Sequence, residues 1–316
     1  MDEPTAPRTP AWALALAFAL VYIAWGTTYL AIKVGVQSFP PLLFGGVRIL
    51  LAGLVLAAYL AWRGQPLTAA GRELLGTAAC SWLMFLGGNG LITLGQRSVD
   101  SGVAAILVAT TPLCTALIEA LYPWGDRLSV RGWFGLCVGL GGVVVLWAPQ
   151  LGQPQQLLVN AGPWLILGST LCWSAGSVLF RYLPRRLPHL SAAALQMVIG
   201  GGTMTLLGLL LGEGEEVSWA DFTLPTVYAF FHLLIVGSLI GFVAYSWLLG
   251  RVSATLAGTY AYVNPVVALL VGWLLGGETI TGWMIAGMVV ILAGVTLVRQ
   301  RGGRADRAAP PATAAA

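Results

Sequence analysis

The chain has 316 residues, of which 58% are hydrophobic and only 9% are charged. Soluble domains carry roughly 25% charged residues, so this composition excludes a soluble protein and indicates an integral membrane protein. The net charge of +4 comes from basic residues scattered among the loops. It therefore indicates membrane topology and gives no reason to expect a nucleic-acid partner.

Hydrophobic stretches recur along the chain. Each has about 18–23 residues, which is enough to cross roughly 30 Å of hydrocarbon as a helix. We expect the first stretch to be kept as a span, because Trp25 and Tyr29 stand where a signal peptide would have small cleavage-site residues. The predicted spans are 11–32, 41–62, 74–95, 101–122, 132–149, 162–182, 190–211, 226–248, 253–275 and 282–299.

The basic residues are divided unequally between the two sides of these spans. With the N-terminus placed inside, thirteen of the sixteen Lys and Arg residues fall in inside loops or tails. Only Lys33 and Arg97 fall outside, and Arg48 lies within a span. Short cytoplasmic loops are enriched in Lys and Arg in this way. The pattern predicts ten spans with both termini in the cytoplasm.

The second half of the chain repeats features of the first. Trp25 begins a run with small residues that ends at Lys33, and Trp173 begins a matching run that ends at Arg181. Five spans is an odd number, so the second half must be inverted, which places Lys33 outside and Arg181 inside. Inverted repeats are typical of carriers that alternate access around a central site, although some channels also have them.

The expected fold class is therefore all-α integral membrane, with ten transmembrane helices arranged as two inverted five-helix repeats. Each repeat is expected to form one unit of the fold, and a polar, uncharged stretch near the middle of the chain separates them. The predicted divisions are a cytoplasmic N-terminus at 1–10, the first repeat at 11–149, a periplasmic linker at 150–161, the second repeat at 162–299 and a disordered basic cytoplasmic tail at 300–316.

Several short motifs are shared with a known family. They are Ala24–Tyr29, Ile32-Lys33, Pro40-Pro41, Gly46–Arg48, Gly88–Gly90, Ser101–Ala105, Ser253–Ala257, Tyr260–Pro265 and Gly277-Glu278. Through them the chain resembles the EamA family of the drug/metabolite transporter superfamily over about 11–299. The resemblance implies a ten-helix protein of the bacterial inner membrane that exports small metabolites, amino acids or drug-like compounds. Small four-helix relatives couple protons through an acid in their first span, and 11–32 contains none.

Polar and aromatic side chains inside the spans are the candidates for a substrate site. Lipid cannot satisfy their hydrogen bonds, so they should face protein or a water-filled cavity. Trp25 lies about seven residues inside the predicted end of its span, too deep for an interfacial tryptophan. Helix packing is the alternative role for each candidate. The candidate substrate-binding residues are Trp25, Thr28, Tyr29, Asn89, Thr110, Thr111, Trp173, Ser177, Tyr245, Tyr260, Tyr262 and Asn264.

Two prolines and two charges complete the candidate residues. Pro112 and Pro265 occupy matching places in the two repeats, where each would kink its helix beside the pathway. Arg48 would bind a substrate carboxylate or act as a structural anchor. Glu119 is the one obvious acid for proton coupling, and a snorkelling or Arg-paired acid is its alternative role.

These features favour a secondary carrier that exports small organic metabolites by alternating access. A passive facilitator or channel is the alternative. A membrane-embedded enzyme is disfavoured, because two His and one acid within a span cannot assemble a catalytic site. No GxxxxGK[ST] motif occurs, which excludes ATP hydrolysis by this chain. We expect no cofactor or metal, and a monomer whose partners are its small-molecule substrate and membrane lipid.

Overall fold

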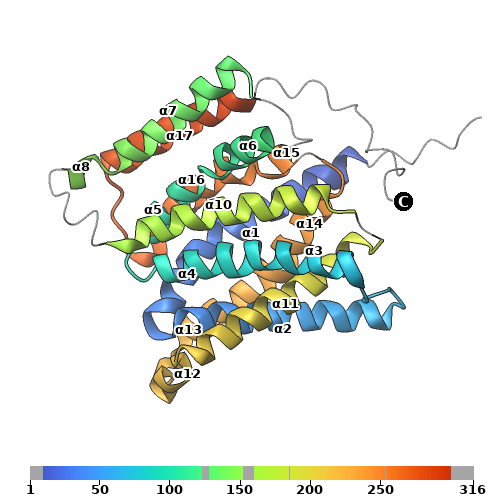
Figure 1. Cartoon of the computed structure of the whole chain (residues 1–316). Coiled ribbons are helices and arrows are strands. Elements are labelled where there is room, and N and C mark those ends of the chain that lie inside the picture. The colour runs from blue at the N-terminus through green and yellow to red at the C-terminus, as the bar shows by residue number, and fades with distance from the viewer. Residues whose placement is uncertain (1–9, 123–127, 152–159, 185, 253, 300–316) are drawn as a thin grey trace, which may run out of the picture.

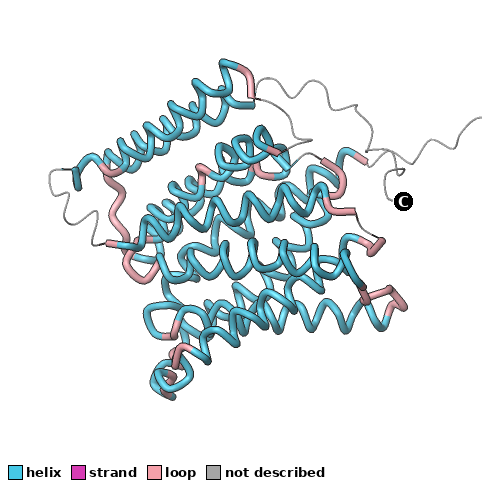
Figure 2. Tube along the Cα trace, viewed as in Figure 1, coloured by secondary structure: helices cyan, strands magenta, loops and turns pink. Residues whose placement is uncertain are grey.

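The structure is a computed structural model, and it describes residues 10–122, 128–151, 160–184, 186–252 and 254–299. The elements over these ranges are all helical, and the loops gather at the two ends of the helices (Figure 2). The predicted tail at 300–316, residues 1–9 and most of the predicted linker, 152–159, lie outside the described residues.

The first half contains α1 (Ala11–Ser38), α2 (Pro41–Trp62), α3 (Gly71–Ser81), η1 (Trp82–Gly90), α4 (Leu91–Gly95), α5 (Ser101–Val108), α6 (Thr111–Leu121), α7 (Val130–Leu146) and α8 (Ala148–Leu151). The second half contains α10 (Ala161–Tyr182), α11 (His189–Leu210), α12 (Glu213–Glu216), η2 (Trp219–Asp221), α13 (Leu224–His232), η3 (Leu233–Phe242), α14 (Val243–Leu249), α15 (Ala254–Ala257), α16 (Tyr260–Gly276) and α17 (Gly282–Arg299).

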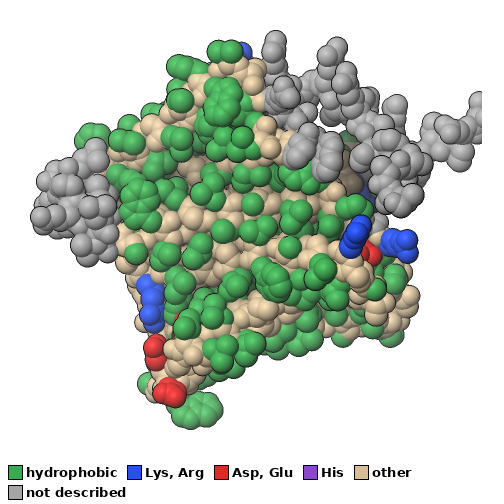
Figure 3. All heavy atoms as spheres, in the orientation of Figure 1, with side chains coloured by type: hydrophobic (Ala, Val, Ile, Leu, Met, Phe, Trp, Pro, Cys, Tyr) green, Lys and Arg blue, Asp and Glu red, His purple; other side chains and the backbone are tan. Residues whose placement is uncertain are grey.

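Ten hydrophobic spans run through these elements. Seven described helices or helix runs are long and apolar enough to cross a membrane, and the shorter apolar helices Val130–Leu146, Tyr260–Gly276 and Gly282–Val298 supply the others. Figure 3 shows hydrophobic side chains over most of the visible face, with charged side chains mainly at its edges. The predicted all-α membrane fold with ten spans is confirmed.

Equivalent helices of the two halves pair with each other. Figure 1 shows α7 beside α17 at one side of the molecule and α2 beside α11 at the other. Small residues allow this approach: a methyl group at Gly46 would lie 2.6 Å from Thr205 N, and one at Gly142 would lie 2.6 Å from Ile291 N. Backbones that approach so closely need glycine at the contact. The spans that carry the central site therefore lie between two tightly packed helix pairs.

The first span is longer than the sequence predicts. Helix α1 continues past the expected end at 32 to Ser38, because the residues that follow Lys33 remain apolar and helical. It ends before Pro40, and Phe39 is already extended, as residues before proline usually are. Trp25 consequently lies close to the middle of α1 and deeper than the seven residues predicted.

The third and eighth spans each contain a π-helical segment. In the third span η1 separates α3 from α4, and in the eighth span η3 separates α13 from α14. The two spans are equivalent in the repeats, so the wide helix occurs once in each half. Such segments are rare and occur frequently at functional sites.

The two repeat-related prolines have different surroundings. Span four breaks between α5 and α6, and Pro112 lies in the first turn of α6, where its missing N–H costs no helical hydrogen bond. Span nine breaks between α15 and α16, and Pro265 lies inside α16, beyond the break. Both spans break ahead of their proline, and only Pro265 lies inside a helix, where its missing N–H removes a helical hydrogen bond.

Candidate functional site

One cavity lies between the two halves, where seven of the spans meet. The space between its lining atoms, counted out to its opening, is about 740 Å³. Twenty residues from both halves line it, so it is larger than the occasional void in a packed interior, which holds about one water molecule. The residues that line it are Trp25, Thr28, Tyr29, Ile32, Arg48, Ile49, Phe85, Gly88, Asn89, Ile92, Val108, Thr111, Ser169, Thr170, Trp173, Leu233, Gly237, Ser238, Phe242 and Tyr260.

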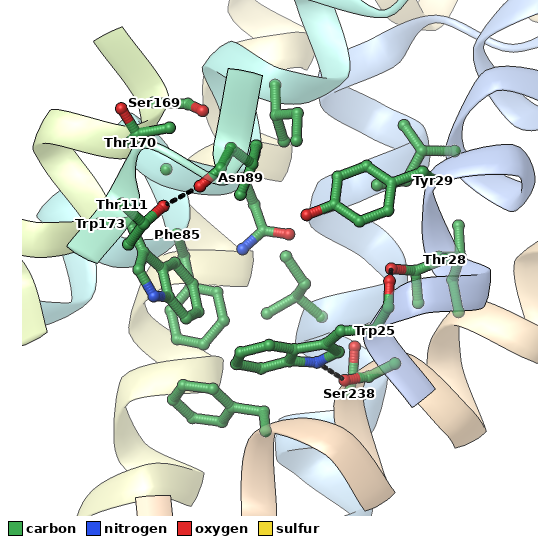
Figure 4. Close-up of a pocket in the computed structure, with 18 of the residues that line it drawn as sticks. Trp25, Thr28, Tyr29, Phe85, Asn89, Thr111, Ser169, Thr170, Trp173 and Ser238 are labelled. Atoms are coloured by element: carbon green, nitrogen blue, oxygen red, sulfur yellow. Dashed lines mark hydrogen bonds between the residues drawn. The ribbon is translucent and has the colours of Figure 1, made fainter. Parts of the chain in front are cut away.

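Aromatic rings line opposite sides of the cavity. The rings of Trp25 in α1 and Trp173 in α10, which are equivalent in the repeats, lie 5.5 Å apart at an angle of 83°. Tyr260 lies 4.6 Å from Trp25, and Tyr245 lies 5.0 Å from it. Figure 4 shows Trp25 and Tyr29 entering from one side, Trp173 and Phe85 from the other, and the Asn89 amide between them. Edge-on ring contacts of this kind stabilise a cluster beyond its buried area.

The π-helical segments provide room for the two tryptophans. A methyl group at Gly241 in η3 would lie 2.5 Å from Trp25 Nε1, and one at Gly88 in η1 would lie 3.0 Å from Trp173. Each tryptophan thus packs on a glycine of the other half. Trp25 also donates from Nε1 to Gly237 O at 3.0 Å. In the described part of the chain, the buried Trp173 Nε1 has no acceptor in hydrogen-bond geometry.

Arg48 brings the one formal charge among the lining residues. Its side chain in α2 is only 4% exposed. One terminal nitrogen donates to Ser238 Oγ at 3.1 Å and the other donates to Asn89 Oδ1 at 3.0 Å. Its Nε is buried and has no acceptor within the described residues. Among these residues no Asp or Glu pairs with it.

The structure brings most of the predicted substrate-binding residues to this cavity. Those that line it are Trp25, Thr28, Tyr29, Asn89, Thr111, Trp173 and Tyr260. Two others stand just behind its wall, where the Ser177 hydroxyl and the Tyr245 hydroxyl are 3.0 Å apart. Tyr245 reaches the cavity residues through its ring contacts with Trp25 and Trp173.

The remaining predicted residues lie outside the lining. Thr110 is buried and donates to Leu107 O at 2.7 Å, a bond within its own span. With its nitrogen facing them, the Asn264 amide donates to Tyr260 O at 3.1 Å and to Tyr22 O at 3.2 Å. Tyr262 is half-buried in α16. Glu119 is buried in α6 and does not line the cavity.

Sequence reasoning missed Ser238 and Phe242 in the eighth span and Phe85 in the third. A serine or phenylalanine in an apolar helix is ordinary, so neither residue type gave a signal alone. The π-helical segments η1 and η3 each supply one oxygen to Arg48, from Asn89 and from Ser238. The internal repeat did not mark Ser238, because Gly241 is the counterpart of Gly88 by its contact with the opposite tryptophan, and Phe242 then stands at the place of Asn89.

The fold and this site define a class: a polytopic helical membrane protein built of two inverted halves around a central cavity. The chain belongs to the EamA-like transporter family, whose model matches residues 12–148 and again residues 160–300. Its sequence is thus that of a family of membrane transporters.

Several relatives agree with this assignment. The inner membrane transporter YedA of Escherichia coli K12 is 38% identical over 283 residues, which cover 86% of each chain. The transporter YoaV of Bacillus subtilis is 27% identical and covers 87% of this chain and 92% of its own. A protein of Salmonella typhimurium named as a probable amino-acid metabolite efflux pump is 26% identical over 87% of this chain and 91% of its own. A solved crystal structure shares the fold, with a TM-score of 0.66 at 21% identity over 92% of this chain and 97% of that chain.

Proposed function

We propose that the protein is a secondary transporter that exports small organic metabolites, namely amino acids, drug-like or aromatic compounds, across the bacterial inner membrane by alternating access. The observation that carries this proposal is the cavity between the inverted halves, in which Trp25 and Trp173 occupy equivalent places. Aromatic faces bind flat, apolar or cationic groups without a matching formal charge. The name of the Salmonella relative supports an amino-acid metabolite as cargo.

Carboxylates hold the halves together on the side that we propose to be periplasmic. Glu278 of the second half accepts from Ser101 N at 2.8 Å and from Gly102 N at 3.0 Å, at the start of α5. Glu213 accepts from Leu42 N at 3.2 Å and from Leu43 N at 2.8 Å, at the start of α2. A carboxylate on free N–H groups at a helix N-terminus forms strong, charge-assisted bonds. An outward-open state requires that at least one of these contacts separates.

Among the described residues, one contact of the same kind joins the halves on the opposite side. Glu73 Oε1, at the start of α3, accepts from Arg186 N at 2.8 Å and from Leu187 N at 2.9 Å, just before α11. The alternating-access proposal therefore assigns the Glu213 and Glu278 contacts to the outer closure and the Glu73 contact to the inner one. The proposal retains repeats at 11–149 and 162–299, cytoplasmic termini, and a monomer without cofactor or enzymatic activity.

Counterflow in proteoliposomes tests the proposal. Vesicles preloaded with a mixed pool of unlabelled amino acids and aromatic metabolites receive a trace of one labelled member at a time, with and without a pH gradient. A carrier gives a transient overshoot of label, and its rate of uptake saturates as the concentration of the labelled compound rises. Linear, non-saturating entry without overshoot would instead establish a channel. An overshoot that requires the pH gradient would indicate proton coupling, and Glu119→Gln would then be expected to abolish it.

A further inference from the structure

We infer that Arg48 is the charge-selecting residue of the cavity: it binds a carboxylate of the cargo, so the transported molecules are carboxylates with an apolar or aromatic body. This inference rests on the proposed function, because it concerns the cargo of the same cavity. Three independent features support it: the missing counter-charge, the spare donors of the guanidinium, and the way in which both halves hold it.

The first feature is the missing counter-charge. Arg48 is 4% exposed and lies within a membrane span. The two oxygens that it contacts belong to Asn89 and Ser238, which are neutral side chains. No described Asp or Glu lies within ion-pair distance of it. An isolated cation inside the membrane is costly, and such residues mark substrate pathways. A bound anion would supply the charge that this cavity lacks.

The second feature is the number of unused donors. An arginine side chain has five N–H donors in a planar fork. The bonds to Asn89 and Ser238 account for two of them, and Nε is buried without an acceptor among the described residues. A carboxylate accepts two parallel bonds from such a fork, which is the preferred geometry of arginine recognition. Arg48 therefore retains one N–H on each terminal nitrogen that its contacts with Asn89 and Ser238 do not use.

The third feature is that each half of the protein supplies one contact. Asn89 belongs to η1 of the first half and Ser238 to η3 of the second, the π-helical segments of the equivalent third and eighth spans. Both residues position Arg48 and need not touch the cargo themselves. A movement of one half against the other changes this support, which links the hold on the carboxylate to the transport cycle.

The aromatic rings of the cavity accommodate the rest of the molecule. Trp25, Trp173 and Phe85 line the same space as Arg48. Their rings form a wall without formal charge (Figure 4). A ligand with a carboxylate at one end and an apolar body at the other matches both surfaces.

Matched pairs of acids and amides test the inference. The purified protein is titrated with phenylalanine and phenylalaninamide, leucine and leucinamide, and 3-phenylpropanoate and 3-phenylpropanamide. The rise in melting temperature with concentration gives an apparent Kd for each compound. We expect the acid of at least one pair to bind about tenfold or more tightly than its amide, as the loss of one partner of a buried charge contact implies. Arg48→Gln should reduce this preference to about twofold or less, and Arg48→Lys should retain part of it.

Two further variants separate charge selection from a structural role. Arg97→Gln removes an exposed arginine that lies 3.8 Å from Glu216, outside the cavity, and should leave the preference unchanged. Ser238→Ala removes one support of Arg48 and should weaken the acid severalfold while the amide binds as before. If Arg48→Gln does not fold, the effect of Ser238→Ala on binding of the acid decides whether Arg48 selects the charge of the cargo. Equal binding of acids and amides by the unmodified protein, or an undiminished preference in Arg48→Gln, would overturn the inference.

Counterflow of the same compounds separates this inference from the proposal beneath it. Exchange of the amides without exchange of the acids would leave the transporter intact and overturn the role of Arg48. Exchange of the acids by the unmodified protein, with exchange lost in Arg48→Gln and partly restored in Arg48→Lys, is the opposite result. This result would support both the transporter proposal and the role of Arg48. If no member of any pair binds or exchanges, both are contradicted.

Discussion

At the scale of single residues, the contact between Gly241 and the cavity residue Trp25 leaves no room for a side chain. A methyl group at this position would lie 2.5 Å from Trp25 Nε1, so Gly241→Ala must displace the indole and break its bond to Gly237 O. We expect the variant to lose about 1–3 kcal/mol of stability, as overpacked interiors do, and to transport more slowly. Melting temperature and counterflow rate measure both effects. Gly141→Ala is the matched control, because no atom would lie within 4 Å of its new methyl group.

At the scale of elements, the start of α5 depends on a carboxylate from the other half. Glu278→Gln removes the charge and leaves one acceptor oxygen for the two N–H groups of Ser101 and Gly102. The expected cost is about 1–3 kcal/mol, the range for a buried donor left unsatisfied. If these bonds close the outer side, a membrane-impermeant thiol reagent should also reach a cysteine at Thr28, which lines the cavity, faster in this variant. Glu215 is exposed, so Glu215→Gln is the control and should change neither the melting temperature nor the rate of labelling. The same unchanged result for Glu278→Gln would contradict the assignment of Glu278 to the outer closure.

At the scale of the whole molecule, inversion of the halves predicts opposite sides for equivalent loops. The loop after α2 contains Gln65, and the connection after α11 contains Glu215, both exposed. Cysteines placed at these sites, in a chain without its four native cysteines, should differ in access to an impermeant maleimide in spheroplasts. Glu215→Cys should react from the periplasm, and Gln65→Cys should react only after lysis. Equal labelling of the two sites in intact spheroplasts would contradict the proposed topology.

Sequence could predict the spans and the equivalence of Trp25 and Trp173 for definite physical reasons. The thickness of the bilayer's hydrocarbon core fixes the length of each apolar stretch, and the internal repeat relates Trp25 to Trp173. It could not predict the π-helical segments, because their apolar composition equals that of an α-helix. Two contacts between the halves were equally inaccessible, since Ser238 lies 190 positions from Arg48 and Glu278 lies 177 positions from Ser101 along the chain. Such contacts depend on how the helices pack, and the local sequence pattern does not determine that packing.

The capping of α5 by Glu278 also bears on biosynthesis. Ser101 and Gly102 are translated long before Glu278, which follows them by 177 and 176 positions. Until Glu278 has been synthesised, these two N–H groups lack their carboxylate partner. The cap at the start of α5 can therefore form only after the ninth span has been translated.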